Sequence, residues 1–445
     1  MPFSPIDSII FSTLFSDASV TDVFSDEQFV RYMLEVEAAL ARVEGRLGVI
    51  PAQAGRQIDL AAREIKVDFE RLRSATKKDG FPVIELVRQI RAQAGEAAAG
   101  YVHWGATTQD IMDTALILQL RDGLGVLEGI LNKLIPGLAK LADRHRNTLM
   151  AGRTHSQQAL PITFGFKVAN WLAPLLRHRQ RLAELRPRLL VVQFGGAVGT
   201  LAALGDSGLG VQQGLADEFK LSVLPMPWHT QRDNLVELAG WLSLVSGSLA
   251  KIAQDIILMA QTEIAEIREA ADKTLGGSST MPQKGNPIVS EAVVAAARMN
   301  ASLLASMHQA LIQEHERATG GWQMEWLALP QMFGLTASAL QKTLFLGENL
   351  VVDEAQMQRN VQNSNGLMLA EGLTFILAQS MGRREAEQLV RDACQIALQQ
   401  KRNLITVVRE KIPAPADWPT LRSEADYLGY TQAFIDRILH EAVTG

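Results

Sequence analysis

The sequence of 445 residues has very little cysteine, because Cys394 is the only one. A single thiol excludes an internal disulfide and any metal site built from several thiolates, and it suits a reducing compartment. The net charge is also small, since 43 basic residues stand against 48 acidic ones. A formal charge of -5 offers no general attraction for nucleic acid or an anionic membrane, so an anionic ligand would need a local cluster of donors.

Long charge-free apolar runs are missing as well. The longest candidate, residues 189–205, contains Gln193 and four glycines, whereas about 20 apolar residues are needed to cross a bilayer. The first 19 residues lack a basic region and are interrupted by Pro5, Asp7 and Asp17, so they do not resemble a secretory signal. We therefore expect a cytoplasmic protein with neither nucleic acid nor membrane as a partner.

Signals for β-strands are scarce, since aromatic residues make up 6% of the chain and no Asn-Gly or Asp-Gly lies between two alternating runs. Helical signals are frequent instead. Ser25 and Gln28 form a capping-box pattern, and the apolar residues that follow recur at steps of three and four up to Leu47. Gly48 and Pro51 then predict the end of this helix.

The same helical rhythm predicts long helices over residues 111–141, 164–185, 235–267, 288–312 and 332–350. Helices of this length favour a bundle in which neighbouring helices cover each apolar stripe. The fold class is therefore all-α, with three helical domains. We place an N-terminal domain at residues 1–105, a central long five-helix bundle at 106–352 and a C-terminal domain at 353–445.

The segment most suggestive of chemistry is residues 275–287, Leu-Gly-Gly-Ser-Ser-Thr-Met-Pro-Gln-Lys-Gly-Asn-Pro, between two predicted helices. Its glycines and prolines allow unusual backbone conformations, and Lys284 and Asn286 could bind an anion. On composition alone, an ordinary polar connector fits equally well. The full pattern G-S-S-x-M-P-x-K-x-N-P, however, resembles the signature loop of the fumarase/aspartase superfamily.

Two further segments resemble the same superfamily in the right order, so the resemblance spans nearly the whole chain. Residues 103–114 are similar to its H-x-G-x-T-S-x-D-x-x-D-T region, with Thr108 in place of the commoner serine. The hydroxyl is retained, although the additional methyl group changes the site. Residues 152–157, Gly-Arg-Thr-His-Ser-Gln, resemble the G-R-T-H-x-Q element, whose histidine is the usual partner of the serine loop.

Within the superfamily, residues 11–15, 158–167, 195–200 and 314–317 look most like the bacterial 3-carboxy-cis,cis-muconate cycloisomerases. Adenylosuccinate lyases carry an Arg-Tyr pair near the N-terminus that helps bind the nucleotide. Here the first such pair, Arg31-Tyr32, falls within the first predicted helix. A lyase that splits a C–N bond and releases fumarate stays open as an alternative. So does a non-catalytic structural protein, since lens crystallins use the same scaffold.

The resemblance implies an isomerase of protocatechuate catabolism, the β-ketoadipate pathway, that converts 3-carboxy-cis,cis-muconate, a small tricarboxylate, into 4-carboxymuconolactone without a cofactor or metal. It implies that Ser278 exchanges the proton and that His155 and Lys284 complete the catalytic set. Alone, a histidine between Thr154 and Gln157 also suits a structural role. The residues implied to bind substrate are His103, Thr107, Thr108, Thr154, Gln157, Ser279, Met281, Asn286, Arg317 and Gln231.

The resemblance also implies a homotetramer in which the central helices form a 20-helix bundle and three subunits build each active site. The polar cluster of His229, Gln231, Arg232 and Asp233 has two interpretations. In the family such a cluster can approach the substrate from a neighbouring subunit. A solvated turn explains the same residues equally well.

Overall fold

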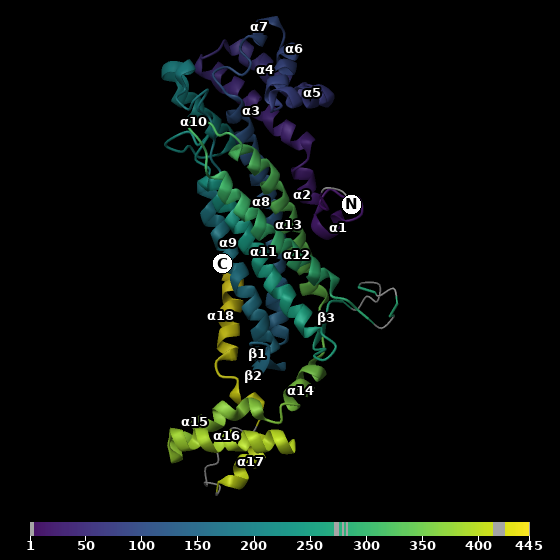
Figure 1. The fold of residues 1–445 in the computed structure, drawn as a ribbon. Helices are drawn as coiled ribbons and strands as arrows, with labels where there is room; N and C mark the ends of the chain where they lie inside the picture. Colours follow the sequence, from purple (N-terminus) through teal and green to yellow (C-terminus); the bar gives the residue numbers. More distant parts are fainter. Residues whose placement is uncertain (1–3, 271–275, 278–279, 282–283, 413–422, 445) are drawn as a thin grey trace. The chain divides into compact units, whose positions relative to one another are not determined.

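The computed structural model describes residues 4–270, 276–277, 280–281, 284–412 and 423–444. Most of this part of the chain is helical, and its strands form two small two-stranded sheets (Figure 1). The mainly helical fold confirms the prediction from the sequence. The contacts divide the chain into two compact units: unit 1 comprises residues 1–130, 178–247 and 295–341, and unit 2 comprises 131–177, 248–294 and 342–445. The division into three domains at residues 105 and 352 stays a prediction.

The elements follow one another along the chain in a simple order. The first helices are α1 (Ser12–Phe15), α2 (Ala18–Val23), α3 (Asp26–Leu47), α4 (Ala52–Glu64), α5 (Phe69–Asp79), α6 (Val83–Ala94) and α7 (Glu96–Ala99). The long helices are α8 (Thr108–Arg144), α9 (Phe164–Leu189), α11 (Asp233–Met259), α12 (Ile288–Ala310) and α13 (Gly321–Asn349), with η1 (Ala202–Ser207) and α10 (Gly208–Phe219) between α9 and α11. The remaining helices are α14 (Glu354–Gln362), η2 (Leu367–Leu369), α15 (Ala370–Met381), α16 (Arg383–Gln400), α17 (Leu404–Lys411), η3 (Glu424–Tyr427) and α18 (Thr431–Thr444). The strands are β1 (Leu149–Thr154), β2 (Gln157–Thr163), β3 (Ile267–Arg268) and β4 (Val351–Val352).

Helix α3 forms where the capping signals predict it. The Ser25 side chain accepts a hydrogen bond from the Gln28 N–H at 3.3 Å, and Gly48 ends the helix with a positive φ of 73°. Its apolar stripe is buried, and α4 lies very close to it. A Cβ atom on Gly55 would lie 2.6 Å from the Ala41 carbonyl oxygen, so only glycine permits this approach.

The five long helices each contribute residues to both units, and within each unit they run alongside one another (Figure 1). In unit 1 the buried Asn300 of α12 donates to Ser246 of α11 at 3.1 Å and to Thr336 of α13 at 2.9 Å. In unit 2 the Trp171 indole of α9 donates to Asp255 of α11 at 2.7 Å. These buried polar contacts fix which faces of the helices meet, in addition to the apolar packing.

Two predicted helix boundaries were wrong. The helix predicted over residues 235–267 ends at Met259, because the chain turns at Ala265, whose φ is 51°, and Ile267 lies in β3. The helix predicted to begin at Met332 begins at Gly321 instead. Its first turns contain Glu325, which is buried in an ion pair with Arg232. A charged residue at a core position hides the apolar stripe from a periodicity argument.

Two helices, α11 and α12, are long and apolar enough to cross a membrane by length and composition alone. Their most apolar windows have a mean hydropathy of 1.4, and 44% and 39% of these windows are buried. A search for charge-free runs missed them because each contains an acidic residue, Glu237 and Glu291 respectively. Much of their apolar surface is therefore uncovered within one chain.

Candidate active site

His155 lies at the tip of a β-hairpin in unit 2. Thr154 of β1 pairs with Gln157 of β2, which leaves His155 and Ser156 as a two-residue turn. Their φ angles are 49° and 62°, the geometry of a type I′ turn, which Asn and Gly normally occupy. Each non-glycine residue in this conformation costs about 1 kcal/mol. The sequence did not predict this hairpin because its turn lacks the usual residues.

The base of this hairpin is fixed by a buried ion pair. Arg153 donates to both carboxylate oxygens of Glu266, at 2.9 and 2.6 Å, and the Glu266 side chain is fully buried. Asn360 of α14 donates to the same carboxylate at 3.0 Å, and the Glu266 carbonyl accepts from the Asp353 N–H at 2.9 Å. Glu266 directly precedes β3, which leads toward the serine loop, so one carboxylate connects the hairpin to that segment.

Ser278 and Ser279 lie outside the described residues, and the part of their loop that is described has a defined base. Gly277 and Gly285 form an antiparallel bridge, and the Asn286 N–H donates to the Gly276 carbonyl at 2.9 Å. Gly276 has a φ of 71°, and a Cβ atom there would lie 2.2 Å from the Asn286 carbonyl oxygen. Glycine is thus required at this position.

The other loop candidates, Met281 and Lys284, are exposed, and the Lys284 N–H donates to the Met281 carbonyl at 3.0 Å. Beyond the loop, the buried Glu269 accepts from the N–H groups of Val289 and Ser290 at 3.1 and 2.7 Å. A carboxylate at the start of α12 satisfies amide groups that the helix leaves free. The segment before the loop is therefore bound to the helix after it.

Thr107 and Thr108 lie at the start of α8 in unit 1. The Thr107 N–H donates to Asp110 at 3.0 Å, one half of a capping box. The Asp110 carboxylate is buried and also accepts from the N–H groups of Gly195 and Gly196, both at 2.9 Å. These bonds connect the threonine pair to the glycine-rich segment that follows α9.

His229 joins the same cluster, since its Nε2 lies 2.7 Å from an Asp110 oxygen. The side chain is buried, as is Arg232, so a solvated turn is wrong for these two residues. Gln231 and Asp233 between and beside them are exposed. The turn thus has one buried side that packs on α8 and one side open to solvent.

Arg317 reaches this cluster from the segment before α13. It donates to the Gln109 side chain at 2.6 Å and to the Ala197 carbonyl at 2.8 Å. Gln109 in turn donates to the His229 carbonyl at 2.9 Å and to Asp113 at 3.0 Å. A chain of hydrogen bonds therefore connects Arg317 to the start of α8.

Arg232 lies beneath these groups and is fully buried. It binds Asp113 at 2.6 Å and the carboxylate of Glu325, with the Trp228 ring 4.7 Å away. Burial raises the pKa of Glu325 although Arg232 opposes this shift. A charge network of this kind is stable only while every member is present, so it serves as a rigid support for the start of α8.

His103 belongs to the turn before α8 and has a φ of 65°. Its Nδ1 lies 2.6 Å from a carboxylate oxygen of Glu37, whose side chain is fully buried in α3. Burial by itself would lower the pKa of His103, but Glu37 and then Asp110 raise it above its ordinary value. The ring is therefore suited to carry a positive charge near neutral pH.

The structure gathers the candidate residues into two groups, each described within its own unit. Unit 1 holds His103, Thr107, Thr108, Gln231 and Arg317. Unit 2 holds Thr154, His155, Gln157, Met281, Lys284 and Asn286. Within the described residues, no group of three or more His, Cys, Asp or Glu side chains could hold a metal ion.

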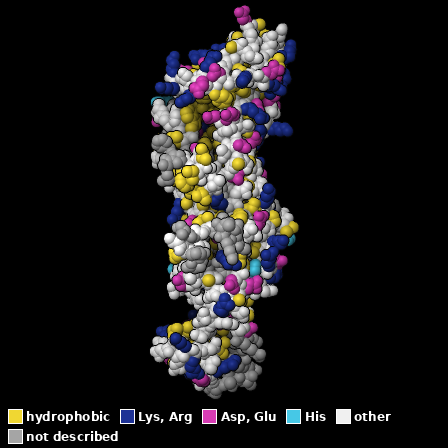
Figure 2. Space-filling model, turned by 90° about the vertical axis from the view of Figure 1, so that its right-hand side faces the viewer, with side chains coloured by type: hydrophobic (Ala, Val, Ile, Leu, Met, Phe, Trp, Pro, Cys, Tyr) yellow, Lys and Arg dark blue, Asp and Glu magenta, His cyan; other side chains and the backbone are white. Residues whose placement is uncertain are grey.

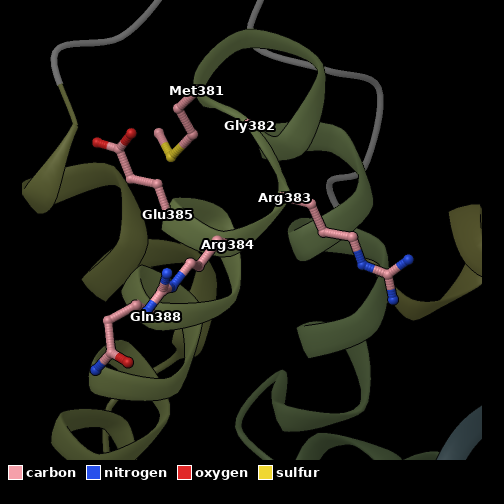
Figure 3. A pocket seen from close by; sticks show the side chains of 6 residues that line it. All are labelled: Met381, Gly382, Arg383, Arg384, Glu385 and Gln388. Carbon is pink, nitrogen blue, oxygen red and sulfur yellow. The ribbon is translucent and has the colours of Figure 1, made fainter.

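The surface hollow in Figure 3 lies elsewhere, at the start of α16. It is lined by Met381, Gly382, Arg383, Arg384, Glu385 and Gln388. None of the candidate residues is among them, so this hollow is separate from the candidate active site.

A family model described as a lyase matches residues 15–299. The chain belongs to this lyase family. The match confirms the resemblance to the fumarase/aspartase superfamily, because it includes both the T-H element and the serine loop.

Similar proteins of the family cover nearly the whole chain. A 3-carboxy-cis,cis-muconate cycloisomerase from Pseudomonas aeruginosa is 46% identical over 440 residues, 97% of this chain and 96% of that protein. The crystal structure of a 3-carboxy-cis,cis-muconate lactonizing enzyme from Pseudomonas putida matches with a TM-score of 0.91 and 40% identity, covering 98% and 99% of the two chains. A trans-aconitate decarboxylase from Mycosarcoma maydis is 39% identical over 433 residues, 96% of this chain and 88% of that protein.

The sequence argument missed several residues that position the site. Glu37 and Glu44 occupy buried positions of α3, and Glu266 precedes β3 by one residue. A glutamate among the apolar positions of a helix was the available signal for the first two, since charged residues are rarely fully buried without a partner. No local pattern identifies Glu266, because its partners lie in distant parts of the sequence.

Proposed function

We propose that the chain is a cycloisomerase that converts 3-carboxy-cis,cis-muconate into 4-carboxymuconolactone in protocatechuate catabolism. The observation that carries this proposal is near full-length similarity to cycloisomerases in a chain that keeps both motif regions intact. The geometry supports it, since one unit presents hydroxyl and cationic groups at the start of α8 and the other presents His155 on a strained turn.

The reaction is an internal addition. A carboxylate oxygen of the substrate forms a bond to one alkene carbon, and the electron pair of the double bond moves toward a neighbouring carboxylate. A proton then adds to the adjacent carbon, so the lactone has the composition of the substrate acid and one carboxylate fewer. No electron is gained or lost, and a cofactor is unnecessary.

Negative charge is the main barrier, because the intermediate concentrates charge beside a carboxylate. Donors aimed there in advance are the usual solution, and loss of one typically costs about 100-fold or more in rate. Lys284, Asn286, Thr107, Thr108 and Arg317 are the donors that we assign. His103, Thr154, Gln157, Gln231, Ser279 and Met281 complete the substrate-binding set.

Ser278 is the residue to which we assign proton exchange. A serine hydroxyl is a weak acid and base unless its alkoxide is stabilised, for which Lys284 and the loop amides are suited. His155 binds a substrate carboxylate in this scheme, because lactonisation expels no group that needs a general acid.

We further propose that the protein acts in the cytoplasm as a homotetramer with a 20-helix bundle and active sites shared by three subunits. Apolar side chains on the long helices remain open to solvent in one chain: Leu244 is 52%, Met299 46% and Leu327 70% exposed. Figure 2 shows apolar side chains reaching the surface in patches on the face that it presents. A second copy of the chain would cover such patches.

A second candidate activity is favoured by one relative. The trans-aconitate decarboxylase carries in its name a substrate that is also a tricarboxylate. The same anion-binding groups would suit it, and release of carbon dioxide would distinguish that reaction from lactonisation. The adenylosuccinate lyase and structural alternatives make their own prediction, namely fumarate from adenylosuccinate or no turnover.

Replacement of Ser278 tests the assignment. We expect Ser278→Ala to reduce kcat about 1,000-fold, within the range for loss of an acid–base group, while the fold is retained. The measurement is the loss of ultraviolet absorbance as the conjugated diene of 3-carboxy-cis,cis-muconate is consumed. Ser302→Ala, on the exposed face of α12, is the matched control and should turn over normally. A near-normal rate in Ser278→Ala would refute the role of this serine.

A further inference from the structure

Helix α3 carries two glutamates among its buried residues, about two turns apart. Glu37 is 1% exposed and Glu44 is 0% exposed. Within the described part of the chain, neither oxygen of Glu44 and only one oxygen of Glu37 has a hydrogen-bond partner. Burial of a carboxylate without compensation is very unfavourable, so the two groups need a reason to be stable there.

The compensating group of Glu37 is His103. The Glu37 oxygen lies 2.6 Å from His103 Nδ1, a short distance typical of a charge-assisted hydrogen bond. Because Nδ1 is bound to Glu37, Nε2 is the ring nitrogen that remains to donate to a ligand. The His103 side chain keeps 17% of its surface exposed, which is enough for such a contact.

The backbone holds the ring in place as well. His103 has a φ of 65° and Gly105, two residues on, a φ of 70°, so the turn before α8 adopts a conformation that few residues tolerate. Strained residues persist only where the surrounding contacts determine them, and they cluster at functional sites. The bond to Glu37 is one such contact, and it connects the turn to α3.

Charged groups on three helices act on the ring. Glu37 of α3 and Asp110 of α8 favour the imidazolium, whereas Arg91 of α6 and burial oppose it, and the balance raises the pKa of His103. Glu44 behaves differently, since burial first and then Glu37 raise its pKa to about 9. Near neutral pH, Glu44 is therefore uncharged, and Glu37 is the member of the pair that acts on His103.

We propose that Glu37 is a positioning residue that fixes the ring of His103 and holds its positive charge, so that Nε2 donates to a carboxylate of the substrate. The inference rests on the proposed function, which assigns a tricarboxylate substrate to this site. Glu37 itself does not touch the substrate. Its effect therefore belongs in the binding of the anion and in the pH at which that binding is lost.

Glu37→Gln keeps the shape of the side chain and removes its charge. The imidazolium exists below the pKa of His103, and loss of Glu37 lowers that pKa. We expect the alkaline limb of kcat/KM to move by about one pH unit or more toward lower pH. At pH 7.5 we expect KM to rise about 10-fold, the value of one charge-assisted hydrogen bond, with a smaller change in kcat.

Glu44→Gln is the matched control, because it replaces a neutral acid by a neutral amide on the same helix. It should leave KM and the pH profile unchanged. His103→Gln should show the KM increase of Glu37→Gln, and the double variant should add little to it, since both changes remove the same interaction. Additive effects in this cycle, or an unchanged KM and pH profile in Glu37→Gln, would overturn the proposal.

An NMR titration of the His103 ring in the wild-type protein and in Glu37→Gln measures the coupling directly, without turnover. An unchanged His103 titration would refute the inference even if the enzyme lactonises carboxymuconate. A lowered His103 titration in an enzyme inactive on carboxymuconate would refute the proposed function but support the coupling. If Glu37→Gln fails to fold, the pH profile of His103→Gln decides: retention of the wild-type alkaline limb would refute the inference.

Discussion

At the scale of single residues, burial has opposite consequences for two acidic groups of unit 1. Asp110 accepts hydrogen bonds from three backbone N–H groups and lies 2.7 Å from His229. Glu44 is equally buried, and its carboxyl oxygens have no partner within the described residues. A buried acid without donors is tolerated by staying protonated, which makes stability depend on pH.

Glu44→Gln should therefore remove a pH dependence of stability. The pKa of Glu44 rises from an ordinary 4.5 to about 9, so its contribution is complete below pH 4.5 and is lost as the pH rises toward 9. A difference of one between the folded and unfolded pKa values is worth about 1.4 kcal/mol, so the two proteins should differ in stability by a few kcal/mol at about pH 8.5.

Thermal unfolding of both proteins at about pH 5 and about pH 8.5 measures this effect. The melting temperature of the wild type should fall relative to that of Glu44→Gln as the pH increases. Parallel melting temperatures at the two pH values would contradict a protonated Glu44 in the folded state.

At the scale of elements, the His155 hairpin shows how a motif acquires its geometry. Two residues with positive φ make the turn, and the ion pair of Arg153 and Glu266 fixes its base against β3 and α14. The motif letters G-R-T-H-x-Q thus contain a support, Arg153, next to the residues that face solvent. The support and the site occupy neighbouring positions because successive residues of a strand point to opposite faces.

Glu266→Gln should destabilise the protein, because it leaves the buried Arg153 without a counter-charge. Loss of one partner of a buried ion pair typically costs about 3 kcal/mol. We expect a lower melting temperature and a reduced kcat, since the hairpin and the segment before the serine loop share this carboxylate.

Asp436→Asn is the comparison, since it removes one partner of the exposed pair with Arg146. Surface pairs contribute little to stability, so this variant should melt close to the wild type. Differential scanning calorimetry and the absorbance assay measure both variants. Equal melting temperatures for Glu266→Gln and Asp436→Asn would contradict the structural role of the buried pair.

At the scale of the whole molecule, the exposed apolar side chains of α11 and α12 are the main unexplained surface. These helices are apolar enough to pass a membrane-span criterion, yet each also carries a buried polar residue, Ser246 and Asn300, bonded to the other within unit 1. Helices of a bundle that continue into neighbouring subunits would have this composition.

A charge on the open face of α12 tests the proposed assembly. Met299 is 46% exposed, and we expect Met299→Glu to lower the oligomeric mass in light scattering and to reduce activity, because the proposed sites need several subunits. Leu60→Glu on α4, where the leucine is 55% exposed, is the matched control and should keep the wild-type mass. An unchanged mass for Met299→Glu would contradict burial of this face between copies.

The sequence by itself determined the helical class, the start and end of α3 and the positions of most long helices, because periodicity and caps are local properties of the chain. It also led to the lyase family through motifs that are contiguous in the sequence. Boundaries failed where a distant partner changed the local preference, as at Glu325 and Ala265.

Only the tertiary structure decided which side chains support the candidate residues. Glu37 faces His103, Glu266 faces Arg153, and Asp110 collects donors from the segment after α9. These contacts join parts of the chain that are far apart in sequence, and burial then sets the charge of each group. The free energy of a buried charge depends on the partners that folding brings to it, which a local pattern does not contain.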